Sequence, residues 1–252
     1  MEAAHRFIKR MASVEFLLQD VLYISYLVPG RRLQAVIPSN LVLATVGDDR
    51  VFVSLVLFRS TVSRAFMCPS PPIVFDQINL RTYVMDPYTG RPGVFFLDYG
   101  VNVRLIAFLY RVLSGMAVRH IPFSMDVRRD EQSHYRNYKA EGYWEGPLYV
   151  EGKEVSMEMR ELAPFASRDD AVNYLVDPTV GFYGSLGKVR RLEVWHPASS
   201  PRVLRIENVQ CRLLSVKGIV DDADISRPHH ALVVPGWPFL TYLPPRRLPR
   251  ES

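Results

Sequence analysis

The sequence predicts one mainly-β domain with a few flanking helices, built as a barrel or a sandwich. Many apolar runs of strand length are separated by turns rich in Gly, Pro and Asp, and few segments show helical spacing. The chain has 252 residues, which fits one large β domain. No internal repeat or linker divides it, so residues 1–252 are expected to form a single domain.

The clearest strand covers residues 77–84. Its apolar and polar side chains alternate, and alternate residues of a strand face opposite sides of the sheet. One face carries Ile78, Leu80, Thr82 and Val84. The other face carries Gln77, Asn79, Arg81 and Tyr83. If the apolar face packs outward under other elements, the polar face points into the domain.

Further strands are expected wherever apolar residues run or alternate over four to eight positions. Turn signals at 47–50 and 151–154 predict hairpins, because Gly and Asp tolerate turn dihedrals. Residues 60–72 are expected to be a loop. The remaining strands are expected at 21–28, 41–46, 51–58, 94–99, 121–127, 148–150, 155–159, 189–195, 203–214 and 230–234.

Helical spacing predicts three helices. The first is a short N-terminal helical segment within residues 1–18. The second and clearest covers residues 102–113, with Asn102 as its N-cap and Gly115 as its C-terminal stop. The third begins after Ser167, whose hydroxyl is a good N-cap and is followed by acidic residues.

Charge and cysteine content limit the classes of partner. The formal net charge is +5, and arginine supplies most of the positive charge because the chain has only five lysines. Scattered positive charge favours solubility more than specific contact, so nucleic acid is the weakest partner class considered. Residues 244–252 form a basic, proline-rich tail that is expected to be mobile. Cys68 and Cys211 are expected to be free thiols.

The first residues lack the apolar core of a signal peptide. No stretch approaches the roughly 18 apolar residues that a membrane span needs. The longest apolar runs are strand-sized and are interrupted by Pro, Gly or charge. We therefore expect a cytoplasmic protein without membrane contact.

Common motifs of catalysis and cofactor binding are missing from the sequence. It carries no phosphate-binding glycine loop, no nucleophile elbow and no Cys-x-x-Cys pair. The adjacent His229 and His230 would face opposite ways in a strand, so we expect no metal site there and no cofactor. His120 and His196 stand at strand ends, where a histidine either lines a pocket or is an ordinary polar group.

Several segments carry a resemblance to a known family. They are Asn-Leu-Arg-Thr-Tyr-Val at 79–84, Pro-Gly-Val-Phe-Phe-Leu-Asp at 92–98 and, more loosely, Leu-Glu-Val-Trp-His-Pro at 192–197. The chain resembles an uncharacterised bacterial family, a domain of unknown function, that is similar at a distance to the acetoacetate decarboxylase-like superfamily. The resemblance spans residues 19–238 and implies a closed, cone-like antiparallel β-barrel with a pocket inside.

This chain departs from the superfamily that it resembles at the positions of the two reactive lysines. In the decarboxylase a Gly-aromatic-Pro-Lys-Lys segment follows the helix; its first lysine forms a Schiff base, and its second lowers the pKa of the first. Here Val118 stands at the first position and Arg119 at the second, while Gln77 replaces an acid of the family. Valine cannot form an imine and arginine stays protonated, so Schiff-base decarboxylation is not expected.

The remaining candidates follow the polar face of the strand at 77–84. The candidate ligand-binding residues are Gln77, Asn79, Arg81, Tyr83, Tyr99, Arg119, His120 and His196. Arg81 clamps a ligand carboxylate through two hydrogen bonds, forms an internal salt bridge with Asp98 or Glu193, or lies at a solvated edge. Tyr83 and His120 are the candidate proton donors if a reaction is catalysed.

We therefore expect a pocket for a small organic acid or carbonyl compound. If the protein is an enzyme, it is not a Schiff-base decarboxylase. The alternative is a non-catalytic ligand-binding or protein-interaction domain. Assembly into a homo-oligomer stays open, because no interface can be recognised in the sequence.

Overall fold

The structure is a computed structural model, and it describes residues 13–66, 68–155, 163–185 and 187–249. Its strands are β1 Ser13–Pro29, β2 Val42–Leu43, β3 Arg50–Ala65, β4 Cys68–Met85, β5 Pro92–Val101, β6 Arg119–His120, β7 Phe123–Arg129, β8 Tyr135–Tyr143, β9 Pro147–Glu154, β10 Val180–Tyr183, β11 Arg190–Trp195, β12 Arg202–Cys211, β13 His230–Tyr242 and β14 Arg246–Arg247. Its helices are α2 Arg31–Gln34, α3 Arg104–Ser114, α4 Arg168–Leu175, α5 Arg212–Val216 and α6 Asp222–Ile225. The mainly-β class is confirmed. No helix in the described ranges is both long and apolar enough to cross a membrane.

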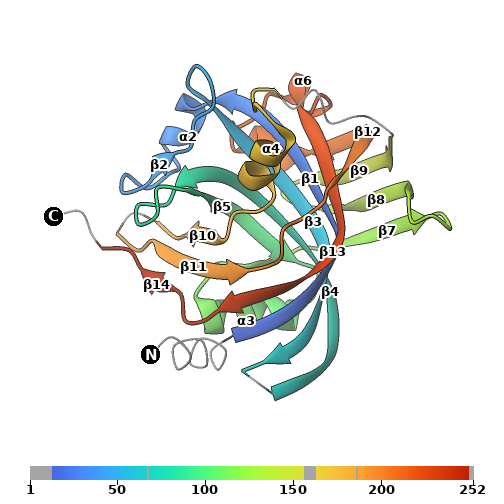
Figure 1. Cartoon of the computed structure of the whole chain (residues 1–252), viewed down its shortest axis with the longest axis horizontal. Coiled ribbons are helices and arrows are strands. Elements are labelled where there is room, and N and C mark those ends of the chain that lie inside the picture. The colour runs from blue at the N-terminus through green and yellow to red at the C-terminus, as the bar shows by residue number, and fades with distance from the viewer. Residues whose placement is uncertain (1–12, 67, 156–162, 186, 250–252) are drawn as a thin grey trace.

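Within the described chain, seven strands pair with one another in a ring. Hydrogen bonding runs from β11 through β10, β5, β4, β3 and β1 to β13, and β13 pairs with β11 again. All these pairings are antiparallel except that of β10 with β5. Helices α4 and α3 lie at opposite ends of the ring (Figure 1). Side chains that point inward are therefore surrounded by strands on all sides.

The strands β12, β9, β8 and β7 continue the sheet from β13 and cover the outer face of β1, β3 and β4. A second hydrophobic core lies between these layers, where Leu22, Leu55 and Ile78 of the ring pack with Tyr138 and Val150. This outer layer buries one face of the long ring strands, and so the opposite face is free to line the interior.

The alternation predicted for residues 77–84 is confirmed by this arrangement. Ile78 and Leu80 lie in the outer core, and both are fully buried. Tyr83 belongs to the inner core, on the same side of β4 as Gln77, Asn79 and Arg81. Because alternate residues of a strand face opposite sides, the polar side chains of this part of β4 point into the ring.

Both chain ends differ from the sequence-based expectation. The helix expected within 1–18 is wrong for Ser13–Leu18, because these residues pair with β3 and β13 as the start of β1; residues 1–12 lie outside the described chain. The tail expected to be mobile from residue 244 is wrong in its first part. Arg246 and Arg247 pair with β11, and Leu248 is buried in a third small core.

Three turn predictions are also corrected. Residues 60–65 and 68–72 are not a loop, because β3 and β4 continue as a long hairpin in which Arg64 pairs with Pro69 and Ala65 with Cys68. The hairpin expected at 47–50 is reduced to one bridge between Val46 and Arg50, since β2 pairs with β4 instead. Residues 151–154 lie inside β9, which pairs on both sides with β8 and β12.

The two other helix predictions are confirmed except for one cap. Helix α3 ends at Gly115, which has a φ of 70° as a left-handed C-cap requires. Its N-cap is Val103, not Asn102; the Asn102 side chain accepts a hydrogen bond from the backbone N–H of Asp76 instead. Helix α4 is capped as predicted, since Ser167 Oγ accepts from Asp170 N at 3.1 Å. Cys68 and Cys211 are both free thiols, also as predicted.

Candidate functional site

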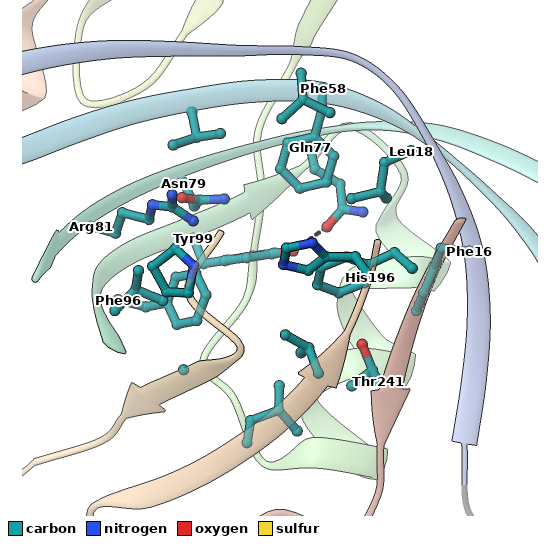
Figure 2. A pocket seen from close by; sticks show the side chains of 18 of the residues that line it. Phe16, Leu18, Phe58, Gln77, Asn79, Arg81, Phe96, Tyr99, His196 and Thr241 are labelled. Carbon is teal, nitrogen blue, oxygen red and sulfur yellow. Dashed lines mark hydrogen bonds between the residues drawn. The ribbon is translucent and has the colours of Figure 1, made fainter. Parts of the chain in front are cut away.

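A cavity of about 110 Å³ lies inside the ring. Every one of the seven ring strands contributes to its wall, and α3, the segment after α4 and the end of β11 complete it (Figure 2). Its apolar wall residues are Phe16, Leu18, Val21, Val56, Phe58, Val94, Phe96, Met116, Val176, Pro178, Val180, Leu192, Val194 and Phe239. Its other wall residues are Tyr23, Gln77, Asn79, Arg81, Tyr99, Tyr110, Gly181, His196, Trp237 and Thr241.

Arg81 is the charged group of the cavity and is only 9% exposed. Its Nη2 donates a hydrogen bond to the carbonyl of Leu175 at the end of α4, at 2.7 Å. The guanidinium also lies over the ring of Tyr23, 5.0 Å from its centroid. Burial raises the pKa of Tyr23 above its usual value, so this phenol stays neutral and supplies no counter-charge.

None of the ion pairs among described residues includes Arg81. Of the two carboxylates considered as its partners, Asp98 pairs with Arg119 and Lys217, and Glu193 pairs with Arg191. The internal salt bridge considered from the sequence is therefore wrong. A buried arginine without a carboxylate is unusual, because burying an unpaired charge is costly.

Three buried polar atoms in the cavity wall have no hydrogen-bond partner: Asn79 Oδ1, Arg81 Nε and Trp237 Nε1. Their side chains come from β4 and β13, and Figure 2 places Asn79 and Arg81 side by side on one wall. Leaving such a group unsatisfied costs about 1–3 kcal/mol. A molecule bound against this wall that reached these atoms would meet two donors and one acceptor.

A second polar cluster lies further along the same face of β4. Gln77 Nε2 donates to Ser60 Oγ, and the hydroxyls of Tyr99 and Tyr110 both donate to Gln77 Oε1, that of Tyr110 at 3.3 Å. Burial raises the pKa of Tyr110 to about 12 and that of Tyr99 well above its usual value. Both phenols are therefore protonated near neutral pH and act as donors, not as bases.

His196 also lies in the wall, just after the end of β11. Its ring stacks between two aromatic rings of β13, at 5.4 Å from the centroid of Trp237 and 5.6 Å from that of Phe239. Its Nδ1 lies 3.0 Å from the carbonyl oxygen of Pro197. Stacking and this contact hold the ring in one orientation at the cavity surface.

The other predicted site residues lie outside the cavity wall. Tyr83 is in the inner core next to it, where its hydroxyl donates to the Leu175 carbonyl at 2.8 Å and lies 2.8 Å from Ser54 Oγ. Arg119 pairs with Asp98 and Glu145 on the outer side of β6, and the neighbouring His120 is exposed. Five of the eight predicted positions are therefore brought together in one cavity: Gln77, Asn79, Arg81, Tyr99 and His196.

Sequence reasoning missed the contribution of β13. The last strand was expected to end at residue 234, whereas β13 continues to Tyr242, and Trp237, Phe239 and Thr241 all line the cavity. The alternation of these three positions is a strand signal. Pro238 obscured it, because proline is disfavoured inside strands.

No described lysine belongs to the cavity wall. Val118 is fully buried in the inner core, and the charge of Arg119 beside it is compensated by two carboxylates. Elsewhere in the described ranges, no group of three His, Cys, Asp or Glu side chains could hold a metal ion. His229 and His230, expected to face opposite ways, instead lie with their Nδ1 atoms 2.9 Å apart, because β13 begins only at His230.

Three solved structures are similar to this fold. Acetoacetate decarboxylase from Legionella pneumophila subsp. pneumophila str. Philadelphia 1 has a TM-score of 0.56 at 10% identity, covering 94% of this chain and 87% of that one. An acetoacetate decarboxylase-like enzyme from Sphingomonas wittichii RW1 has a TM-score of 0.59 at 12% identity, covering 95% and 94%. The enduracididine biosynthesis enzyme MppR complexed with pyruvate has a TM-score of 0.56 at 12% identity, covering 95% and 91%. The likeness establishes an acetoacetate decarboxylase-like fold.

The sequence comparisons agree with this fold. The uncharacterized protein YqjF of Bacillus subtilis (strain 168) is 29% identical over 160 residues, which are 62% of this chain and 60% of that protein. The match therefore spans less than two thirds of the relative's length. The model of the DUF2071 family, an uncharacterized conserved protein, matches residues 17–238, and the chain therefore belongs to this family.

Proposed function

We propose that the ring is a closed, cone-like barrel whose cavity binds a small organic acid or carbonyl compound, with Arg81 as the anchor for its oxygen atoms. The single observation that carries this proposal is the group of three unpaired polar atoms in the wall, Asn79 Oδ1, Arg81 Nε and Trp237 Nε1. The three residues that carry these atoms are at most 9% exposed, so solvent does not readily supply a hydrogen-bond partner.

The chemistry of these atoms favours an acid. Arg81 and Trp237 are donors, and Arg81 also carries a charge that forms no ion pair with a described carboxylate. A carboxylate accepts two hydrogen bonds and neutralises the guanidinium at once. The Oδ1 of Asn79 suits a hydroxyl of the same ligand. In support, one protein of similar fold is complexed with pyruvate, an organic acid.

The proposal includes no Schiff base, because no described lysine lines the cavity. This part is tested by incubating the protein with acetoacetate or pyruvate, reducing with borohydride and measuring the intact mass. We expect no mass increment, since an imine needs a neutral primary amine within reach of the bound carbonyl. An increment mapped to any lysine would overturn it.

The anchoring role of Arg81 is tested by thermal unfolding with and without millimolar pyruvate or acetoacetate. A ligand at 100 times its dissociation constant stabilises the folded state by about 2.7 kcal/mol, which is a rise in Tm of roughly 5 °C or more for a chain of this size. Arg81→Gln should abolish this rise, because it removes both the charge and the Nε donor.

Arg191→Gln is the matched control. Arg191 is also 9% exposed, but its guanidinium pairs with Asp86 and Glu193 away from the cavity wall. We expect it to lower the Tm of the free protein and to leave the ligand-induced rise intact. A ligand-induced rise that survives in Arg81→Gln would contradict the proposed anchor.

A further inference from the structure

A second cavity of about 160 Å³ adjoins the ring cavity at the end that α3 covers. We call it the apolar chamber. Its wall is apolar apart from Tyr110, Ser114 and Thr241, and it is built from α3 and from the ends of β1, β3, β4 and β13. Leu113 and Ile73 of this wall are 43% and 38% exposed, so the chamber reaches the protein surface between them.

The two cavities share five wall residues of the described chain: Phe16, Tyr110, Met116, Leu192 and Thr241. The side chains of these shared residues lie at the boundary between the two cavities. Met116 is unbranched and flexible, and such a side chain adapts readily to a neighbouring ligand. A molecule that occupies the ring cavity can therefore extend into the apolar chamber by small side-chain movements.

The polarity of the wall changes in one direction along β4. Its inward residues are, in order, Ile73 and Phe75 in the apolar chamber, then Gln77, Asn79 and Arg81 in the ring cavity. Strands rise about 3.3 Å per residue, so Phe75 and Arg81 lie roughly 20 Å apart along the strand. One strand face thus runs from a fully apolar end to a cationic end.

We infer that the ligand of this protein is an amphipathic acid, whose carboxylate binds at Arg81 and whose apolar tail passes Tyr110 and Met116 into the apolar chamber. This inference rests on the proposed function and adds the class of acid. The size of the chamber supports it, since apolar cavities of about 150 Å³ accommodate a molecule such as benzene. A tail of about four to six carbons fills such a space, and further carbons must cross the ring cavity from Arg81, which indicates an acid of about eight carbons or more.

The tail should contribute strongly to affinity. Each methylene group that leaves water for an apolar site tightens binding about fourfold, or ~0.8 kcal/mol. Octanoate has four methylenes more than butanoate. We therefore expect calorimetry on the whole chain to give an octanoate affinity at least 30-fold higher than that of butanoate, with a more negative heat-capacity change.

Leu113→Trp tests where the tail lies. Leu113 lines the apolar chamber but not the ring cavity, and its partial exposure leaves room for the larger side chain to fold. The tryptophan ring fills the apolar chamber, so the affinity for octanoate should fall at least tenfold, while the affinity for butanoate changes less than twofold. Leu105→Trp is the control, because Leu105 is 63% exposed on the same helix and lines neither cavity. Ala65→Phe, in the opposite wall, is a second filling variant with the same expected effect.

The outcomes separate the two proposals. If butanoate and octanoate bind equally and Arg81→Gln abolishes both, the acid site stands and the inference about the tail is overturned. If octanoate binds more tightly but Leu113→Trp and Ala65→Phe leave that preference unchanged, the tail lies elsewhere and the inference is again overturned. If neither acid binds to the folded protein, the proposed function fails, and the inference fails with it.

Discussion

Asn79 illustrates the conflict between stability and binding at the scale of one residue. Its Oδ1 is buried in the cavity wall without a partner, whereas Asn102 Oδ1 accepts a hydrogen bond from Asp76 N at 2.9 Å. A buried polar atom that lacks a partner destabilises the folded state. Sites that bind ligands commonly retain such groups, because the ligand satisfies them.

The pair of asparagines gives the first prediction. Leucine has nearly the same shape as asparagine, so Asn79→Leu should raise the free energy of unfolding by about 1 kcal/mol. The same change should weaken acid binding at least fivefold. Asn102→Leu should instead lower the free energy of unfolding by about 1 kcal/mol or more, because it leaves Asp76 N without its partner. Urea unfolding and calorimetry measure both. A loss of stability in Asn79→Leu would argue against an unpaired group kept for a ligand.

His230 predicts a pH dependence of stability. Burial, and then the neighbouring His229, lower its pKa from 6.5 to about 3. As the pH falls below 6.5, the unfolded chain binds a proton that the folded chain does not bind, so stability falls with falling pH. The loss is at most about 1.4 kcal/mol per pH unit and less for a partly exposed ring.

Unfolding in urea at pH 7 and pH 5 checks this second prediction. His230→Asn should lose less stability between the two values than the unchanged protein does. His134→Asn is the control, because His134 is about half exposed and pairs with Asp130 at the surface. An equal acid-induced loss in the protein and in His230→Asn would show that another group causes it.

At this scale, five residues of the cavity wall could be predicted from the sequence. Gln77, Asn79 and Arg81 were predicted because alternation along one strand fixes which face each side chain takes. Arg119 was a candidate through a family alignment and His120 because it stands at a strand end. The carboxylates that pair with Arg119, and the strand β5 that pairs with β6, lie elsewhere in the sequence. Trp237 and Phe239 were missed as site residues, because only the pairing of β13 with β1 turns them inward.

At the scale of elements, α4 connects the fold to the site. The carbonyl of Leu175 at its C-terminal end accepts hydrogen bonds from Arg81 and Tyr83. At its other end, Ser167 caps the helix by accepting from Asp170 N. The stability of this short helix therefore helps to hold the guanidinium in place.

The cap gives the third prediction. Ser167→Ala should lower the free energy of unfolding by about 1 kcal/mol, because it removes the acceptor at the N-cap. Ser167→Thr keeps a hydroxyl and should recover most of the loss. Chemical denaturation measures both variants. Equal stability of the alanine and threonine variants would mean that the cap contributes nothing.

Helices and strands were predicted correctly where residues close in sequence determine them. The apolar residues of α3 recur at helical spacing, and Gly115 ends the helix because glycine readily adopts a positive φ. The long β3–β4 hairpin was missed because its residues 60–72 look irregular alone, and partners in β1 make them strands. The apolar stripe of α3 is only partly buried, since Leu105, Phe108, Val112 and Leu113 are exposed.

At the scale of the whole molecule, closing the ring buries a cavity among seven described strands. Closure depends on distant pairings, such as that of β11 with β13, which no local pattern reveals. The sequence predicted a mainly-β fold, and the family resemblance predicted its acetoacetate decarboxylase-like form. The tail was misjudged because Leu248 finds its apolar partners only after the ring has formed.

The tail gives the fourth prediction. Leu248 is 9% exposed in a core with Phe95 and Phe182, next to the pairing of β14 with β11. Leu248→Ala should lower the free energy of unfolding by about 2 kcal/mol. Arg247→Ala, at an exposed position beside it, should change it by less than about 0.5 kcal/mol. A Leu248→Ala variant as stable as the unchanged protein would mean that the tail is not docked in solution.

The most direct test of acid binding inside the ring is a crystal structure of the protein grown with octanoate. We expect density for a carboxylate within about 3 Å of Arg81 Nε, and a tail that passes Met116 into the apolar chamber. Density for the acid only on the outer surface, away from Arg81, would contradict both the proposed site and the inferred path of the tail.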